Sequence, residues 1–232
     1  MCLTNVGSPR MGQPTRKPDS EKKVALRMAT TVIIPARNEE KTIGPIVKMF
    51  SQHLTTRGNV YVFIDADSAD DTGIPVWENG GCAVRTDKYG KGQVVRAGVD
   101  MLARAKQLSS RIILCDGDYT GLTTDHITRI LTPKRGMVVG VPDFPVIDVP
   151  EHVIMAWPQI SGFRCLPVGL IPEDAHGYLL ETQLNLLAIK RRMLITKIMM
   201  PGLISPFQWP LPPRRMRELQ RDRDWGTRNG YL

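Results

Sequence analysis

Cysteines are scarce in this sequence, and long apolar runs are absent from it. Its 232 residues include only Cys2, Cys82, Cys115 and Cys165, and no two of them have the C-x-x-C spacing that is typical of zinc and redox sites. Neither a zinc site nor a disulfide framework is therefore predicted. No window approaches the ~20 apolar residues of a membrane span, and the first residues lack the apolar region of a signal peptide. The sequence thus predicts a cytoplasmic protein without a transmembrane segment.

The length and the charge distribution indicate one domain with basic ends. Hydrophobic residues make up 42% of the chain, which is enough for one sizeable core. Most of the net charge of +8 lies at the ends, because residues 1–28 carry six Lys or Arg against two acids and residues 211–232 carry six against three. We divide the chain into a flexible basic N-terminal tail (1–28), a first half (29–135), a second half (136–210) and a basic C-terminal tail (211–232).

Strands that lead into helices follow one another in the first half. The run TVIIPARNEE (31–40) reads as a strand that stops at Pro35, and Asn38 is expected to cap the helix that follows. A second strand, NVYVFIDADS (59–68), ends in a cluster of short polar side chains. A third strand begins at Cys82 and leads through a Gly-Lys-Gly loop into a helix over 93–107. The carboxylates and hydroxyls after these strands are therefore expected to meet at one edge of a sheet.

A further apolar strand ends in two carboxylates. The run RIILCDGDY (111–119) reads as a buried strand that is followed by Asp116, Gly117 and Asp118. Ligands of open α/β sheets bind where strands end in this way. Two adjacent carboxylates repel each other, and a hard divalent cation that also holds a phosphorylated substrate would relieve that repulsion. The loop before the 93–107 helix would add Lys91 as a cation for a phosphate, with flanking glycines that permit close backbone approach.

Taken in order, these segments resemble the nucleotide-sugar-binding half of GT-A glycosyltransferases over about residues 30–131. Within that superfamily they are most similar to glucosyl-3-phosphoglycerate synthases and polyprenyl-phosphate sugar transferases. The resemblance implies an α/β fold, with a mostly parallel, Rossmann-like sheet flanked by helices in a single domain. It also implies transfer of a sugar from a nucleoside diphosphate sugar, such as a UDP-sugar, to a hydroxyl or phosphate acceptor with Mg²⁺ or Mn²⁺. Residues 29–135 would then bind the donor, and residues 136–210 the acceptor.

The resemblance also assigns roles to individual residues. It places the nucleoside at Pro35, Ala36, Arg37, Glu39, Asp67 and Ser68, the diphosphate at Lys91, the metal at Asp116 and Asp118, and the donor beside Gly117. Phosphoglycerate-type enzymes add a late histidine to the metal shell. No histidine follows Leu184 here, so His176 is the candidate from the second half.

Two further segments resemble the family more weakly, WPQISGFRCLP (157–167) and HGYLLETQL (176–184). Asp174 is the candidate general base of an inverting enzyme, whereas Glu181 would help to organise the site of a retaining one. Both stereochemical outcomes stay open. Acceptor choice is expected in the proline-rich loops between residues 138 and 172.

Two other classes of protein are weighed against a glycosyltransferase. A sugar-phosphate nucleotidyltransferase would need a Gly-rich loop after the first strand, where this chain has PARNEE. A non-catalytic binding module would be expected to have lost the paired aspartates or the lysine. The acceptor stays open between a small phosphorylated acid, a polyprenyl phosphate, a protein side chain and hydroxymethylated bases in DNA of the kind that phage-type transferases modify.

The basic tails bear on that choice. They would either solubilise the protein or bind a polyanion such as nucleic acid or an anionic membrane surface. The C-terminal tail is expected to form a short basic helix over 214–223. Trp209, Trp225 and Tyr231 lie among its arginines, where they would stack on bases or anchor the tail on its own domain.

Overall fold

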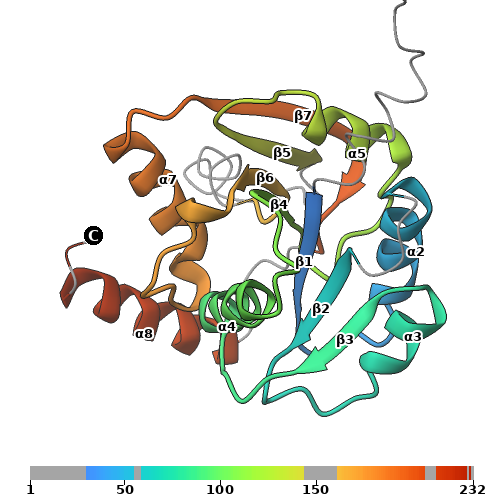
Figure 1. Ribbon diagram of the computed structural model, residues 1–232. Coiled ribbons are helices and arrows are strands. Elements are labelled where there is room, and N and C mark those ends of the chain that lie inside the picture. Colours follow the sequence, from blue (N-terminus) through green and yellow to red (C-terminus); the bar gives the residue numbers. More distant parts are fainter. Residues whose placement is uncertain (1–29, 55–58, 144–160, 207–212, 229, 231–232) are drawn as a thin grey trace, which may run out of the picture.

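The computed structural model describes residues 30–54, 59–143, 161–206, 213–228 and 230, and its strands form one sheet (Figure 1). The seven strands lie in the order β3-β2-β1-β4-β6-β5-β7. Neighbouring strands are parallel, except that β6 runs antiparallel to both β4 and β5. Their bounds are β1 (Thr30–Ala36), β2 (Val60–Ile64), β3 (Cys82–Arg85), β4 (Arg111–Leu114), β5 (Met137–Asp143), β6 (Arg164–Pro167) and β7 (Ile195–Ile204). The predicted mostly parallel α/β sheet is confirmed.

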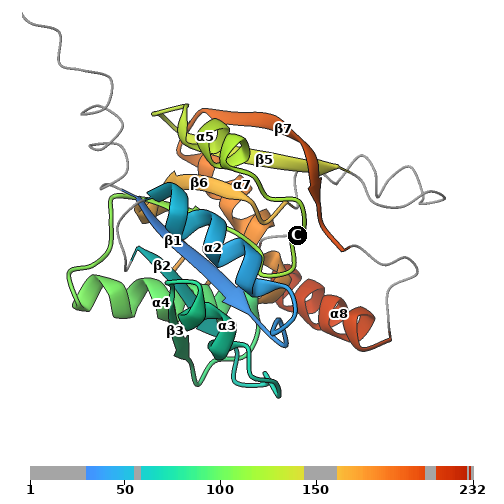
Figure 2. The ribbon, with the colours of Figure 1, turned by 90° about the vertical axis from the view of Figure 1, so that its right-hand side faces the viewer.

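Helices cover both faces of this sheet (Figures 1 and 2). One face packs against α2 (Ile43–Leu54), α3 (Gly73–Glu78) and α5 (Thr124–Leu131). The other packs against α4 (Lys91–Arg104) and α7 (Leu180–Lys190), next to the short 3₁₀ helices η1 (Val168–Leu170) and η2 (Gly177–Leu179). Side chains of β1 alternate between the two cores, with Val32 and Ile34 on the first face and Ile33 on the second. Because both faces are buried, β1 needs a continuous apolar sequence.

The helix boundaries of the first half differ from those that the sequence predicted. The predicted helix over 93–107 is α4, which begins and ends earlier, at Lys91 and Arg104. The prediction that Asn38 caps a helix was wrong, since α2 begins only at Ile43. Asn38 instead has a positive φ of 60° and accepts a hydrogen bond at Oδ1 from the backbone N–H of Ala69, at 2.7 Å. An N-cap residue has an extended backbone and hydrogen-bonds within its own helix, and Asn38 does neither.

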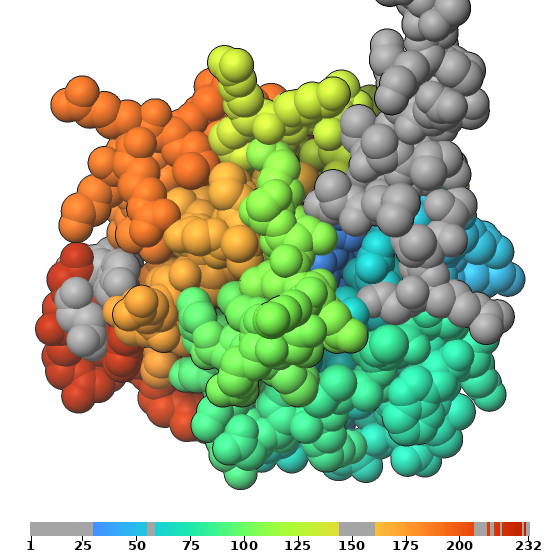
Figure 3. Space-filling view, viewed as in Figure 1, coloured from blue at the N-terminus to red at the C-terminus, as the bar shows by residue number. Residues whose placement is uncertain are grey.

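The second half contains an edge strand, and the C-terminal tail contains a long helix. The apolar run over 194–204 contains the whole of β7, where Met200 and Leu203 are buried while Met199 is exposed. The predicted C-terminal helix is confirmed as α8 (Pro213–Arg228), which is longer than expected at both ends. In the space-filling view, the orange surface around the end of α7 and the start of β7 projects from the body (Figure 3).

Some sequence predictions concern residues outside the described ranges, namely the N-terminal tail (1–28), the segment 144–160, Trp209 and Tyr231. Within the described ranges, Cys82, Cys115 and Cys165 are free thiols. No helix in those ranges is long and apolar enough to cross a membrane.

Candidate active site

The PARNEE turn after β1 and the acidic loop after β2 form one hydrogen-bonded unit. The backbone N–H of Asn38 donates to Ser68 Oγ at 2.9 Å, that of Glu39 to Thr72 Oγ1 at 3.0 Å, and that of Glu40 to Asp70 Oδ2 at 3.0 Å. Ser68, which was predicted to hold the nucleoside, thus orients the turn through its hydroxyl. These short polar side chains are needed because the turn leaves backbone donors without partners in a strand or helix.

Asp70 is the centre of that unit. Its Oδ1 accepts hydrogen bonds from the Thr72 hydroxyl at 2.5 Å, from the Thr72 N–H at 3.2 Å and from the Ser68 hydroxyl at 3.2 Å. Partial burial raises the pKa of Asp70, but the hydrogen bonds from Thr72, Glu40 and Ser68 outweigh it and lower that pKa. Asp70 is therefore a charged structural residue, and the unit that it stabilises fixes the start of the cleft.

Asp65 connects the end of β2 to the loop before α4. This buried carboxylate accepts from the backbone N–H of Asp67 at 2.9 Å and from that of Gly90 at 2.6 Å. Gly90 has a φ of 87°, a backbone conformation that is strained for any residue with a side chain. Gly92, two residues further on, packs so closely that an added Cβ would lie 2.4 Å from the backbone nitrogen of His176. The two glycines therefore place the first turn of α4, and with it Lys91, between the end of β2 and the segment before η2.

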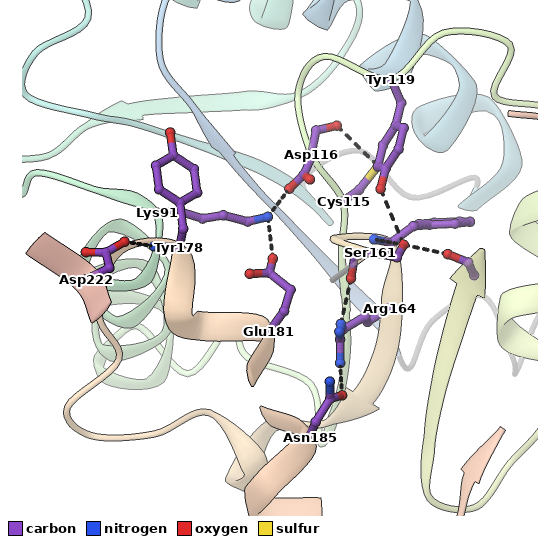
Figure 4. Close-up of polar contacts among 12 residues, drawn as sticks. Lys91, Cys115, Asp116, Tyr119, Ser161, Arg164, Tyr178, Glu181, Asn185 and Asp222 are labelled. Carbon is purple, nitrogen blue, oxygen red and sulfur yellow. Dashed lines mark hydrogen bonds and ion pairs between the residues drawn. The ribbon is translucent and has the colours of Figure 1, made fainter. Parts of the chain in front are cut away.

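Lys91 is the central cation of the site (Figure 4). Its Nζ lies 2.5 Å from Asp116 Oδ1 and 2.5 Å from Glu181 Oε1, and its side chain is 15% exposed. Burial alone lowers the pKa of Lys91, but the charges of Asp116 and Glu181 outweigh it and raise that pKa above the usual value. Lys91 is therefore positively charged, and it joins the two halves of the chain at the floor of the cleft.

Asp118 is a buried carboxylate with an unsatisfied oxygen. Burial, followed by the charges of Asp116 and Glu39, raises the pKa of Asp118 to about 7. Its Oδ1 is buried and has no hydrogen-bond partner among the described residues. An unpartnered buried carboxylate oxygen costs stability, and a bound cation would offset that cost. The Asp116–Asp118 pair therefore fits a hard divalent metal ion.

The segment before β6 lies against this acidic pair. An added Cβ at Gly162 would lie 2.2 Å from Asp116 Oδ2, so only glycine lets the segment pass there. Next to it, Ser161 Oγ donates to the carbonyl of Gly140 at 2.6 Å, and the wholly buried Arg164 donates through Nε to the Ser161 carbonyl at 2.7 Å. Arg164 also donates to Asn185 Oδ1 of α7 at 2.7 Å (Figure 4). Sequence reasoning did not single out Arg164.

Arg37 contacts α8. Its guanidinium donates to both carboxylate oxygens of Glu218, at 3.1 and 3.2 Å, and to the hydroxyl of Tyr178 at 3.2 Å. The pKa of Arg37 is raised, because hydrogen bonding and the charge of Glu218 outweigh its partial burial. One turn further along α8, Asp222 Oδ2 accepts from the backbone N–H of Tyr178 at 2.6 Å. The C-terminal helix is thus docked beside the site.

His176 lies in this α8 contact. Its Nε2 is 3.3 Å from Asp222 Oδ1, its Nδ1 is 2.9 Å from Gln93 Nε2, and its ring stacks on Trp225 with centroids 4.4 Å apart. The expectation that an aromatic residue anchors the tail on its own domain is confirmed for Trp225. Among the described residues no three His, Cys, Asp or Glu side chains are arranged to hold a metal. His176 as a third metal ligand stays a prediction, and its contacts do not favour it.

Most of the predicted donor-site residues line one cleft. It is formed by Pro35, Ala36, Arg37, Glu39, Asp65, Gly90, Lys91, Val94, Asp116, Gly117, Asp118 and Tyr178. An adjoining cavity, which shares Arg37, Gly90 and Tyr178 with the cleft, contains Asp67 and His176 and is walled by α8. Glu181 reaches the cleft through Lys91. Asp174, in contrast, is exposed in a separate hollow next to Arg96 and Leu108, so its predicted role as general base is not favoured by its position.

Solved structures share this fold, whereas no protein-family model and no curated protein matches the sequence. Glucosyl-3-phosphoglycerate synthase from Mycobacterium tuberculosis, in complex with Mn²⁺ and UDP-glucose, matches with a TM-score of 0.70 and 18% identity, over 94% of this chain and 85% of that chain. Its complex with Mn²⁺, UDP-glucose and phosphoglyceric acid matches with a TM-score of 0.68 and 18% identity, over 88% and 80% of the two chains. A crystal structure described as a mycobacterial protein matches with a TM-score of 0.66 and 18% identity, over 83% and 72%. This chain therefore has the GT-A fold of those glycosyltransferases, in a single domain.

Proposed function

We propose that this protein is a glycosyltransferase that moves a sugar from a nucleoside diphosphate sugar to a hydroxyl or phosphate acceptor, with a divalent cation at Asp116 and Asp118. One observation carries the proposal. In a GT-A fold, Lys91 lies between Asp116 and Glu181 in a cleft at the strand ends, beside a carboxylate oxygen of Asp118 that has no hydrogen-bond partner in the described part of the chain. Cationic and metal-binding groups meet there at the place where such folds bind nucleotides.

The reaction requires a diphosphate to leave as the anomeric carbon gains positive charge. When bound, Mg²⁺ or Mn²⁺ would supply positive charge for the departing diphosphate. Lys91 would donate its ammonium hydrogens to the same leaving group, and the N-terminus of α4 adds a favourable dipole there. Glu181 keeps Lys91 charged and oriented through their 2.5 Å contact. The protein's part is thus to hold Lys91, and the aspartates that would bind the cation, in place for the leaving group.

The donor's nucleoside is assigned to the cleft residues at the end of β1. Pro35, Ala36 and Glu39 line the cleft beside Arg37, and the adjoining cavity supplies room next to Asp67. UDP-glucose is the first donor to test, since the structures that share the fold were solved with it. Phosphoglyceric acid is the first acceptor for the same reason, with polyprenyl phosphate and hydroxymethylated DNA as further arms of the screen.

The test is a screen of nucleoside diphosphate sugars for thermal stabilisation that depends on Mn²⁺ or Mg²⁺. Transfer is then measured as release of the nucleoside diphosphate with each acceptor. Asp116→Asn is expected to lower turnover by about 100-fold or more, because it weakens the metal site and the Lys91 contact together. Asp125→Asn, an exposed acid paired with Arg129 on α5, is the matched control. Turnover of Asp116→Asn equal to that of the control in saturating Mn²⁺ would contradict the proposal.

A further inference from the structure

Acidic and basic residues separate along the direction of the strands. The cleft lies at the carboxyl edge of the sheet, and the chain returns from helix to strand at the opposite, amino edge. Counted from the last residue of the helix to the first residue of the strand, the described returns α4–β4, α5–β5 and α7–β7 (104–111, 131–137 and 190–195) carry eight Lys or Arg and no Asp or Glu. The return from α3 to β3 carries one acid, Glu78. These three returns are therefore positively charged. The chain that leaves β6 at the same edge leads to two exposed acids, Glu173 and Asp174, in a hollow beside Arg191.

The most prominent part of this edge is the turn from α7 to β7. Lys190, Arg191 and Arg192 follow one another there, and the apolar side chains on either side are exposed, with Ile189 at 64% and Leu194 at 63%. This is the orange projection of the space-filling view (Figure 3). The exposed Lys134 and Arg135 lie against it, since an added Cβ at Gly136 would be 2.1 Å from the Leu194 carbonyl oxygen. We call Lys134, Arg135, Ile189, Lys190, Arg192 and Leu194 the amino-edge patch.

Helix stability accounts for only part of the amino-edge patch. Basic residues at the end of α7 interact favourably with the helix dipole. That interaction does not explain why Ile189 and Leu194, both branched aliphatic residues, are exposed beside them. Arg191 is not counted in the patch, because it has a structural contact: it donates to the carbonyl of Gly169 at 2.7 Å. The six residues of the patch surround it. Aliphatic and basic side chains together indicate a partner with both apolar and anionic parts.

The charges of the patch decide between partners. A second copy joined through the same patch would bring two basic surfaces together, since the nearby acids Glu173 and Asp174 lie outside the patch, in the adjoining hollow. Nucleic acid would complement the charge but not the aliphatic side chains, since base stacking uses aromatic or guanidinium planes. An anionic bilayer complements both, because aliphatic residues enter the boundary below headgroups that attract Lys and Arg.

We propose that the amino-edge patch docks this protein on an anionic lipid bilayer. Ile189 and Leu194 insert below the headgroups, while Lys134, Arg135, Lys190 and Arg192 lie at the level of the phosphates. Binding is peripheral and reversible, because two aliphatic side chains bury little area. The cleft at the carboxyl edge then faces the aqueous phase. This docking is independent of the proposed reaction, since the patch and the cleft share no residue.

The test is co-sedimentation of the full chain with phosphatidylcholine vesicles that contain or lack phosphatidylserine. We expect binding only to the phosphatidylserine vesicles, and weaker binding as salt is raised. Lys190→Gln with Arg192→Gln is expected to lower the partition coefficient about fivefold for each charge removed. Ile189→Ser with Leu194→Ser is expected to lower it by about tenfold. The matched controls on α8, Met216→Ser and Arg217→Gln, alter an exposed apolar and an exposed basic residue and should bind as the wild type does.

Three results would overturn the docking proposal. The first is the absence of binding to phosphatidylserine vesicles at low salt. The second is wild-type binding by both double variants, which would move the contact to the basic tails. The third is that the wild type binds duplex DNA but not vesicles, and that both double variants lose this DNA binding. Unchanged melting temperatures of the variants, and unchanged hydrolysis of a bound donor, separate each result from misfolding and from failure of the proposed function.

Discussion

The side chain of Asp118 lowers the stability of the fold and is suited to bind a ligand. It is buried beside Asp116 and Glu39, and one of its oxygens has no partner among the described residues. Without a cation, the folded protein must either bury its charge or take up a proton. Either outcome lowers the stability of the folded protein. A role in binding a cation would explain why the arrangement is present.

Asp118→Asn is therefore expected to stabilise the metal-free protein at alkaline pH. The pKa of Asp118 is about 7 in the folded chain and about 3.9 in an unfolded one. A raised carboxyl pKa means that stability falls as pH rises above the unfolded value, and the loss is complete above the folded value. In chelator at pH 8 the variant should gain up to about 4 kcal/mol of unfolding free energy, and the gain should vanish near pH 4.

Thermal melts across pH, with and without Mn²⁺, measure this effect. Mn²⁺ should raise the melting temperature of the wild type and leave that of Asp118→Asn unchanged. A variant that melts below the wild type at pH 8 in chelator would show that Asp118 is a structural acid.

Lys91→Ala tests the phosphate role of the central cation. The variant should bind the diphosphate donor about 10- to 100-fold more weakly, because a charge-assisted contact to the leaving group is lost. Affinity for the free nucleoside should change little. The nucleoside is assigned to the cleft residues at the end of β1, whereas Lys91 lies between Asp116 and Glu181. Calorimetry with both ligands measures the two affinities, and Lys88→Ala, an exposed lysine of the same loop, is the control. Equal losses for donor and nucleoside would remove Lys91 from the phosphate site.

The sequence was informative for residues that follow strands directly. Asp116, Asp118 and Lys91 could be placed at one edge because each comes just after a strand or at the start of a helix that follows one. The partner of Arg37 could not be predicted, because Glu218 lies 181 residues away and has no local sequence signal. Arg164 was missed for a similar reason, since its burial becomes apparent only once β6 lies between β4 and β5.

At the scale of elements, α8 is the feature that most changes the picture of the site. Its acidic residues Glu218 and Asp222 face Arg37 and Tyr178, and Trp225 stacks on His176. The helix therefore supports the segment that leads into α7, on which Glu181 lies. The sequence predicted a basic helix here, but composition could not show that its acids and its tryptophan form the docking face.

Asp222→Ala is expected to loosen that segment. It leaves the Tyr178 N–H without its 2.6 Å acceptor and removes the contact to His176. The loss should destabilise the fold by about 1–3 kcal/mol and speed amide hydrogen exchange over 176–179 and 213–228. Asp224→Ala changes an exposed acid of the same helix, whose contact is with Gln220, and is the control. Identical exchange in both variants would show that Asp222 does not hold α8 in place.

At the scale of the whole molecule, the cleft is assembled from residues 35 to 181, with α8 as an added wall. Deletion of residues 1–28 removes six Lys or Arg and two acids but no residue of the cleft. The truncated protein should therefore hydrolyse a bound donor at a rate within about twofold of the full chain, which steady-state assays can check. A large loss of turnover would place part of the N-terminal tail in the site.

The separation of acids and bases also makes the molecule a permanent electric dipole. Its positive end is the amino edge with its basic helix-to-strand returns, and its negative end is the carboxyl edge, where four acids and two cations line the cleft. A dipole of this kind turns in the field of a charged support before it adsorbs. On a sulfonated resin the protein should adsorb by its basic end, with the cleft open to solution, so that the immobilised protein keeps its access to substrate.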